Sequence, residues 1–425
     1  MMANLLALHR IKMQRNLGVI QLLQDQQRLA QIRQVRDRRW WTRQWLLRRT
    51  DFGQYEMLMN ELRAEDPSAF RNFLRFEPQM FQEILDRITP RIYKADTNYR
   101  KSHVPGLKLA ITLRHLATGD SYHSLMYSFR VAHNTISKHV REVCHASVDE
   151  YSEEVVKCPS SPAEWKVISQ RFADRWNFPH AIGALDGKHV AIKCPPKGGS
   201  QYFNYKKFHS IILFALADAD YKFLWVDVGE PGTASDACIF LDCELRQSIE
   251  DNSLGLPPDE PLPHDDEDSP YCILADDAFP LRTWLMKPYG AKRLTVHERI
   301  LNYRLSRARR VVENAFGILA CRFRCLLTTM QQEPDTVRLI VQSSVCLHNL
   351  MRERYPGTQN AVTDRVDADH NLVPGAWRNV PQTMQDLQRQ FIGGNRQTNA
   401  GKEVRNMFKN YLNTVGAVAW QNDKI

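Results

Sequence analysis

Three carboxylates in this 425-residue sequence have types and surroundings that could support chemistry. Asp186 interrupts the apolar run "AIGALDGKHVAI" at residues 181–192, and Asp276 follows the apolar part of "YCILADDAF". Glu313 is the only acid in the long basic segment "LNYRLSRARRVVENAFGILACRFRCLL". Because burial of an unpaired carboxylate is costly, Asp186 needs a cation, a hydrogen-bond donor or a metal beside it.

The three acids could meet if their elements pack together. We expect Asp186 and Asp276 to converge if their strands are neighbours, and Glu313 to reach the same point from a helix that crosses them. Such a cluster would repel itself unless divalent cations neutralised it, and hard oxygen ligands favour Mg²⁺ or Mn²⁺ over zinc. Two such ions, roughly 3.5–4 Å apart, can activate a water and stabilise the leaving oxygen at a phosphodiester.

The elements around these acids predict an α/β domain over residues 160–350. The order of apolar runs is strand, hairpin, helix, strand and long helix, which fits one mixed sheet flanked by helices. An acidic, Pro-containing stretch at 251–270 is predicted to be an exposed insertion. Residues 356–425 are predicted to form a linker and a helical tail, and the sequence leaves open whether the tail packs on the core.

The segment around Glu313 is strongly basic. Arg309 and Arg310 lie one helical turn before the acid, and we expect this helix to follow a nucleic-acid backbone. Ala315 and Gly317 would keep the helix slim where it approaches the sheet. The alternative is a surface helix whose single Glu pairs with Arg309 or Arg310. We expect the same contact with a nucleic-acid backbone from further arginines of this segment: Arg304, Arg307, Arg322 and Arg324.

Residues 65–150 are predicted to form an all-helical domain that resembles a helix-turn-helix unit. Helices are expected at 107–117, 122–129 and 134–146, with a break at Gly119 and Asp120. The last helix carries Asn134, Lys138 and Arg141, which could contact DNA bases and phosphates. Plain three-helix bundles share this outline, so DNA binding is one of two interpretations.

Charge and composition narrow the class of protein. Residues 1–50 hold eleven Lys and Arg against two Asp, a surplus equal to the net charge of +9 for the whole chain. This basic arm, predicted to be helical over residues 1–55, suits a polyanion or an import signal. The nine scattered cysteines indicate a reducing compartment, and no apolar run approaches the length of a membrane span. Phosphate-binding loops and dinucleotide-binding glycine patterns are absent from the sequence, which leaves nucleotide-dependent enzymes unsupported.

Four segments resemble motifs of the Harbinger-type DDE transposases and the nucleases derived from them. They are "GALDGKHV", "VDVGEPGTASDACIF", "LADDAFPLRTWLMKPY" and "NYRLSRARRVVENAFGILACRFR". The resemblance runs from about residue 65 to the C-terminus, where "VCLHNLM" and "YLNTVGAVAWQ" also look like family segments. It implies a ribonuclease-H-like core, metal-dependent DNA cleavage and joining, and location in the nucleus, with the cytoplasm also open. It also implies a separate Myb-like DNA-binding partner, and self-association stays open.

Carried over by position, the resemblance implies a triad of Asp186, Asp276 and Glu313. The doubled acid Asp276–Asp277 departs from the family pattern, so the second ligand could be either residue, although the register favours Asp276. Asp236 matches a further family aspartate and could be a fourth metal ligand or a capping charge at a helix start.

Other candidates for DNA contact surround these motifs. Lys188 and His189 flank the first aspartate and could contact phosphate or point to solvent. Lys206 precedes a strand, where a DNA-backbone role and a solvated loop are both open. The primary hypothesis is a metal-dependent DNA endonuclease that could also transfer strands. The alternative is a DNA-binding or scaffolding relic without turnover, and an exonuclease or RNA-cleaving enzyme is a third possibility.

Overall fold

The computed structural model describes most of the chain. The described residues are 21, 23–24, 42–98, 101–196, 198–290, 293–356, 363–367, 371–379, 384–386 and 397–425. Most of the predicted basic arm at 1–55 lies outside these residues. Within them, no helix combines the length and apolar character needed to cross a membrane.

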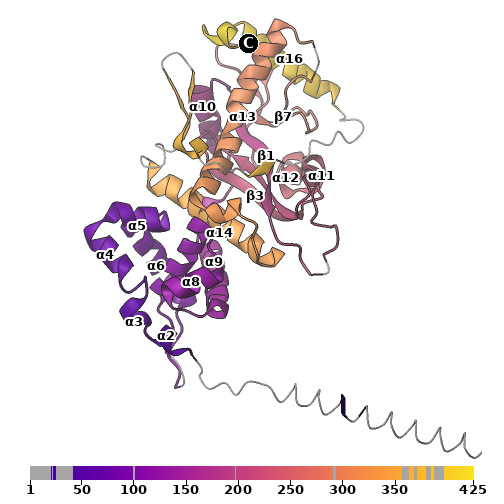
Figure 1. Ribbon diagram of the computed structural model, residues 1–425. Coiled ribbons are helices and arrows are strands. Elements are labelled where there is room, and N and C mark those ends of the chain that lie inside the picture. The colour runs from indigo at the N-terminus through magenta and orange to yellow at the C-terminus, as the bar shows by residue number, and fades with distance from the viewer. Residues whose placement is uncertain are drawn as a thin grey trace, which may run out of the picture.

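Helices make up the N-terminal part of the described chain, drawn in indigo and magenta in Figure 1. Their bounds are α2 Gln44–Leu47, α3 Arg49–Phe52, α4 Leu58–Glu65, α5 Pro67–Leu74, α6 Pro78–Ile92, α7 Pro105–Thr118, α8 Tyr122–Phe129, α9 His133–Val155 and α10 Pro162–Trp176. The sequence-based bounds of α7 and α8 agree with these to within two residues. The predicted end of α9 at residue 146 is wrong, because buried Ser147, Tyr151 and Val155 continue the helical spacing to Val155.

Local signals explain the ends of these helices. The Asp66 carboxylate accepts a hydrogen bond from the Ala69 N–H at 2.9 Å and caps α5. Gly119 ends α7 with a φ of 75°, a left-handed conformation that glycine adopts without a steric penalty. The Ser121 hydroxyl then accepts from the Ser124 N–H and begins α8. The predicted break at Gly119 and Asp120 therefore separates two capped helices.

A mixed sheet forms the centre of the second part of the chain. Its strands are β1 Ala181–Ala191, β2 Ser210–Ala217, β3 Phe223–Pro231, β6 Cys272–Leu274 and β7 Leu285–Met286, in the order β3-β2-β1-β6-β7. Strands β1, β2 and β3 pair antiparallel, whereas β1, β6 and β7 pair parallel. The two-residue strand β10, Gln385–Asp386, also pairs with β1. Two small two-stranded sheets lie elsewhere in the described chain: β4 Glu260–Pro261 with β5 Asp268–Ser269, and β8 Arg365–Val366 with β9 Leu372–Val373.

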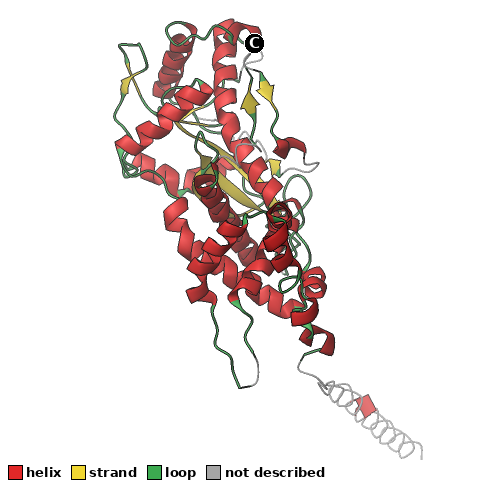
Figure 2. Cartoon of the chain, turned by 90° about the vertical axis from the view of Figure 1, so that its left-hand side faces the viewer, coloured by secondary structure: helices red, strands yellow, loops and turns green. Residues whose placement is uncertain are grey.

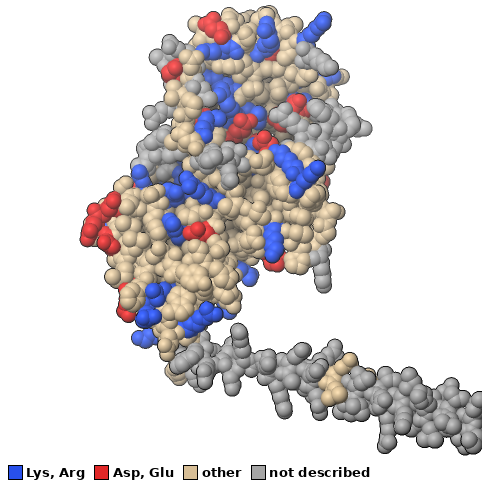
Figure 3. Space-filling view, viewed as in Figure 1, with Lys and Arg blue, Asp and Glu red and all other residues tan. Residues whose placement is uncertain are grey.

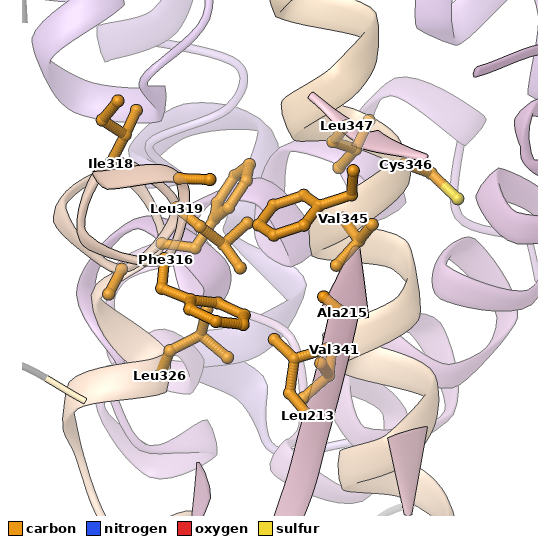
Figure 4. Close-up of a cluster of buried hydrophobic side chains, with 14 of the residues drawn as sticks. Leu213, Ala215, Phe316, Ile318, Leu319, Leu326, Val341, Val345, Cys346 and Leu347 are labelled. Atoms are coloured by element: carbon orange, nitrogen blue, oxygen red, sulfur yellow. The ribbon is translucent and has the colours of Figure 1, made fainter. Parts of the chain in front are cut away.

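Helices cover both faces of this sheet, as Figure 2 shows from the side. The helices are α11 Asp236–Asp242, α12 Glu244–Glu250, α13 Val296–Arg322, α14 Pro334–Arg354 and α16 Asn399–Asn413. Alternate residues of each strand enter two separate apolar clusters, one shared with α13 and α14 and the other with α11 and α12. Figure 4 shows the first cluster, where Leu213 and Ala215 of β2 meet Phe316 of α13 and Val341 of α14. A 3₁₀ turn, Arg324–Leu327, follows α13.

The predicted acidic insertion and the predicted C-terminal tail differ in how they pack on the rest of the described chain. The acidic insertion at 251–270 is largely exposed and contains the β4–β5 hairpin. The C-terminal helix α16 packs back onto α13 (Figure 1). All nine cysteines are free thiols, including the Cys321 and Cys325 pair.

Candidate nuclease site

Asp186 and Asp276 lie on neighbouring strands. Parallel pairing joins Ala184 of β1 to Leu274 of β6, and each aspartate stands two residues further along its strand direction. Because side chains alternate with a period of two, both aspartates face the same layer as Ala184 and Leu274, which is the layer of α13. They are 7% and 8% exposed. The prediction that the two strands are neighbours is therefore correct.

Glu313 enters this layer from α13. The helix begins at a complete capping box, in which Thr295 and Glu298 satisfy each other's backbone N–H groups. Four residues before Glu313, the Arg309 guanidinium donates to the Glu313 carboxylate at 2.5 Å. This is the pairing that the alternative interpretation of the helix predicted. The Arg309 side chain is 14% exposed and the Glu313 side chain is 37% exposed, so the pair is partly buried, with the carboxylate as the more exposed partner.

Arg309 connects all three acids. Burial lowers the pKa of its guanidinium, but the carboxylates of Asp186, Glu313 and Asp276 together outweigh burial and raise the pKa. A guanidinium can be stabilised by three carboxylates only if it lies within electrostatic reach of each of them. The three acids that the sequence singled out therefore all stabilise the charge of Arg309, which pairs directly with Glu313.

Lys188 supplies a second internal cation. Its ammonium lies 3.2 Å from Asp186 Oδ2, contacts the Asp386 carboxylate, and sits 5.8 Å from the centre of the Phe316 ring on α13. Burial opposes its charge, but Asp186, Asp386 and Glu313 raise the pKa of Lys188. Figure 3 shows acidic side chains lying between Lys and Arg side chains on the face that carries α13.

The donor set fits a hard divalent cation by its chemistry, since it consists of carboxylate oxygens. Among the described residues, however, no three His, Cys, Asp or Glu side chains are grouped closely enough to hold an ion. Lys188 and Arg309 engage Asp186 and Glu313 instead, and so act as the counter-charges of the cluster.

The two adjacent aspartates differ in their surroundings. Asp276 is buried, and its Oδ1 accepts a hydrogen bond from the Ala278 N–H at 2.9 Å. Asp277 is half-buried, and its backbone carbonyl accepts from Lys287 Nζ at 3.0 Å. Asp276 is among the carboxylates that raise the pKa of Arg309. Asp236 is the first residue of α11, but its side chain lies outside the described part, so its role stays a prediction.

The remaining arginines of α13 correct one expectation. Arg304 and Arg307 are 2% and 4% exposed and donate to the Asn177 carbonyl and side chain. Arg322 is also buried and contacts His348 Nδ1 at 3.2 Å. These side chains anchor α13 inside the fold, so the prediction that they track a DNA backbone is wrong. Arg310 is half-exposed and Arg324 is exposed.

Gly317 has a different role from the predicted one. A Cβ atom at this position would lie 2.2 Å from Cε3 of Trp377. The glycine therefore makes room for an indole from the C-terminal part of the chain, rather than for the sheet. Next to that indole, the Arg378 guanidinium pairs with the Asp364 carboxylate at 2.7 Å and reaches Asn314 of α13.

Two of the predicted DNA-contacting residues near β1, His189 and Lys206, differ in their access to solvent. His189 faces the layer opposite to the acids, is 3% exposed, and its Nδ1 lies 3.0 Å from the Ser210 hydroxyl. In this position phosphate cannot reach it, because the imidazole is enclosed by Tyr205 and Phe208. Lys206 is half-exposed, and its ammonium donates to the Gln385 side chain at 3.0 Å.

Helix α9 presents the predicted DNA-contacting residues to solvent. Asn134, Lys138 and Arg141 are all exposed and lie at spacings of four and three residues, which places them on one face. His145 is exposed at the next position of the same stripe. Residues on the other side of α9 are buried against the neighbouring helices, including Ile136, Val140 and Val143.

Two family-like segments have structural roles that the sequence did not reveal. In "VCLHNLM", the Asn349 amide donates to the carbonyls of Val155 and Phe223 at 2.7 Å and accepts from the Phe223 N–H at 3.0 Å. It thereby joins α14 to both α9 and β3. In the terminal segment, Gln421 accepts from the Arg304 guanidinium at 2.8 Å, and Trp420 lies 4.7 Å from Arg307.

Asp386 is the site residue that sequence reasoning missed. It stands 200 positions after Asp186, in a polar segment without periodicity or a motif. Only the pairing of β10 with β1 brings it to Lys188. No local signal in the sequence could have identified it.

Comparison with known proteins gives matches over the part of the chain that contains this site. Residues 185–349 match the family model described as DDE superfamily endonuclease. "Protein ALP1-like" of Arabidopsis thaliana is 26% identical over 296 residues, which is 68% of this chain and 71% of that protein. "Putative nuclease HARBI1" of Rattus norvegicus is 26% identical over 283 residues, 65% of this chain and 75% of that protein. No solved structure gives a match. These findings confirm the resemblance seen in the motifs: residues 185–349 are similar to the DDE superfamily endonuclease family.

Proposed function

We propose that this protein is a divalent-metal-dependent nuclease that hydrolyses DNA phosphodiester bonds, with Asp186, Asp276 and Glu313 as the catalytic carboxylates. The observation that carries the proposal is the convergence of these acids on Arg309, from two adjacent strands and a helix. The sheet order, three antiparallel strands continued by two parallel ones, supports a ribonuclease-H-like core. The relative named as a nuclease supports the reaction class.

The chain's own residues would share the work as follows. Asp186 and Asp276 would hold Mg²⁺ or Mn²⁺. Glu313 would become a further ligand when its carboxylate releases Arg309 and binds the ion instead. Bound ions of this kind supply Lewis-acid activation of water and stabilisation of a leaving oxygen. Arg309 and Lys188 would neutralise the phosphate that approaches the acids, and Arg310 and Lys206 would contact the DNA backbone. Asp236 as a further ligand belongs to the same proposal.

DNA would also be held away from the acids. The exposed stripe on α9 formed by Asn134, Lys138 and Arg141 suits contact with a DNA groove, as in a helix-turn-helix unit. By resemblance, a Myb-like protein would assist in recognition, and the protein would work in the nucleus. Strand transfer by a freed 3′ hydroxyl is the further activity that the resemblance suggests.

A second candidate function follows from the internal cations. Lys188 and Arg309 already neutralise the acids without a metal, so the fold could persist as a DNA-binding scaffold that has no turnover. The two functions differ in whether the acids are needed for a measurable reaction.

Cleavage of supercoiled plasmid and labelled oligonucleotides with Mg²⁺ or Mn²⁺ distinguishes them. We expect wild-type activity to be lost in Asp276→Asn and in Glu313→Gln, and kept in the matched variant Asp277→Asn. Activity that persists in the first two variants contradicts the site. An inactive wild type, with a nuclear extract supplying the partner, supports the scaffold. Single-stranded RNA and end-labelled DNA in parallel reactions separate RNA cleavage and exonuclease action from endonuclease action.

A further inference from the structure

The short strand β10 lies beside the proposed site. Strand β2 pairs with β1 from Ala184 to Ala191 and so occupies one edge of β1 over this whole length. The pairing of Asp386 with Lys188 must therefore use the other edge, which is the edge that β6 uses at Ala181–Ala184. Along this edge, Asp386 stands opposite Lys188, two positions beyond Asp186.

The Lys188 ammonium is held between two carboxylates of different character. One partner is Asp186 at 3.2 Å, whose side chain is 11% exposed, and the other is Asp386, whose side chain is 74% exposed. The Lys188 side chain is 8% exposed, and its ammonium lies over the ring of Phe316, so it has little access to water. The position of the ammonium therefore depends on the relative strength of its attraction to Asp186 and to Asp386.

We propose that Asp386 is a positioning residue of the nuclease site. It holds Lys188 so that the Asp186 carboxylate is available to bind a divalent cation. This inference rests on the proposed function. An ammonium paired with Asp186 competes directly with a metal ion for the same carboxylate oxygens. When Asp386 draws the ammonium along the edge of β1, Asp186 loses that competitor and keeps its charge for the ion. Without the Asp386 carboxylate, Asp186 is the nearest acid left for Lys188.

Neighbouring contacts fix β10 independently of the carboxylate. Tyr205 Oη donates to the Asp386 backbone carbonyl at 3.3 Å, and Lys206 Nζ donates to Gln385 Oε1 at 3.0 Å. Removal of the charge at residue 386 should therefore leave β10 in place. If Asp386 served only to tether the C-terminal segment, its charge would have no effect on metal affinity.

The test measures Mn²⁺ affinity of the full-length protein without DNA, by calorimetry or by the spin-resonance signal of free Mn²⁺. We expect Asp386→Asn to weaken Mn²⁺ binding by about 1.5-fold to fivefold, the range of an exposed charge pair. Asp386→Glu should restore most of the affinity. In the Lys188→Met background, the Asp386→Asn change should have less than about half of its effect on a logarithmic scale, because the competitor is gone.

The outcomes separate the inference from the proposed function. Equal effects of Asp386→Asn in both backgrounds mean that Asp386 attracts the ion directly, which overturns the positioning role. Unchanged Mn²⁺ affinity in Asp386→Asn also overturns it, provided that Asp186→Asn abolishes binding. If Asp186→Asn leaves Mn²⁺ affinity unchanged, or the wild type binds no Mn²⁺, the metal site itself is wrong and both ideas fail. Lys188→Gln replaces Lys188→Met if the latter does not fold, as judged by circular dichroism.

Discussion

Asp186 and Asp276 occupy equivalent positions on adjacent parallel strands, each two residues beyond the paired Ala184 and Leu274. Two acids in this relationship face the same layer of the fold, and both are largely buried. Such proximity of buried like charges requires nearby cations, and Lys188 and Arg309 supply them in this structure.

Divalent ions should stabilise the folded protein through Asp186. A ligand that binds only the folded state at 100 times its dissociation constant stabilises it by about 2.7 kcal/mol. We expect Mg²⁺ to raise the thermal midpoint of the wild type and to have little effect on Asp186→Asn, whereas Asp277→Asn should respond like the wild type. Differential scanning fluorimetry at increasing Mg²⁺ concentrations provides the measurement. An equal rise in all three proteins would show that the ions act elsewhere.

The exposed face of α9 should contribute to DNA affinity. Substitution of Lys138 or Arg141 by Ala should weaken binding and reduce the dependence of log K on log salt by about 0.9 for each lost phosphate contact. Lys157→Ala is the matched control, since Lys157 is exposed but follows the end of α9. Fluorescence anisotropy with duplex DNA at several salt concentrations measures both quantities. Identical salt slopes for the three variants would argue against this face.

Asn349 should be a large contributor to stability. Its side chain is fully buried and makes three hydrogen bonds to the backbone of Val155 and Phe223. Asn349→Ala leaves these groups unsatisfied, so we expect a loss of about 2–5 kcal/mol in the free energy of unfolding. Asn60→Ala removes one exposed hydrogen bond to the Glu56 carbonyl and should change stability by less than about 0.5 kcal/mol. Urea denaturation followed by tryptophan fluorescence decides the question, and comparable losses would contradict the role given to Asn349.

Gly317→Ala should disturb the packing of the C-terminal part against α13. The added methyl would lie 2.2 Å from Trp377, so the indole must move and the fold should lose about 1–3 kcal/mol. At Gly290 a Cβ has no neighbour within 4 Å, which makes Gly290→Ala a suitable control. Chemical denaturation of both variants gives the comparison. A Gly317→Ala protein as stable as the control would mean that Trp377 is not tightly held.

His189 should make stability depend on pH. Burial, with Lys206 nearby, lowers the pKa of His189 to about 4, below its ordinary value of 6.5. The unfolded chain therefore binds a proton at a higher pH than the folded one, so stability is constant above pH 6.5 and decreases as the pH falls toward 4. The contribution is at most about 3 kcal/mol.

The matched variant is His189→Asn, whose amide can keep the hydrogen bond to Ser210. The difference in unfolding free energy between wild type and variant should shift in favour of the variant from pH 8 to pH 5. Urea denaturation at the two pH values measures it. A constant difference would assign the acid sensitivity to other buried groups.

Much of the fold followed from patterns that are local in the chain. The apolar runs predicted β1, β2 and β3, because alternating or continuous apolar residues over the length of a strand are typical of buried strands. Gly119 marked the end of α7, because glycine adopts the left-handed backbone conformation of a helix end without a steric penalty. In contrast, the end of α9 was missed, since its last turns are buried by contacts with α14 rather than by a sequence signal.

The sequence by itself determined which acids were candidates, because Asp186, Asp276 and Glu313 stand out against apolar or basic neighbours in the chain. Only the tertiary structure decided which cationic side chains pair with these acids. Arg309 turned inward while Arg304, Arg307 and Arg322 became anchors, and Asp386 reached Lys188 from a segment without any motif. The physical reason is that a charge's role depends on distance and burial in three dimensions, which residues far apart in the chain acquire only when the sheet and its helices pack together.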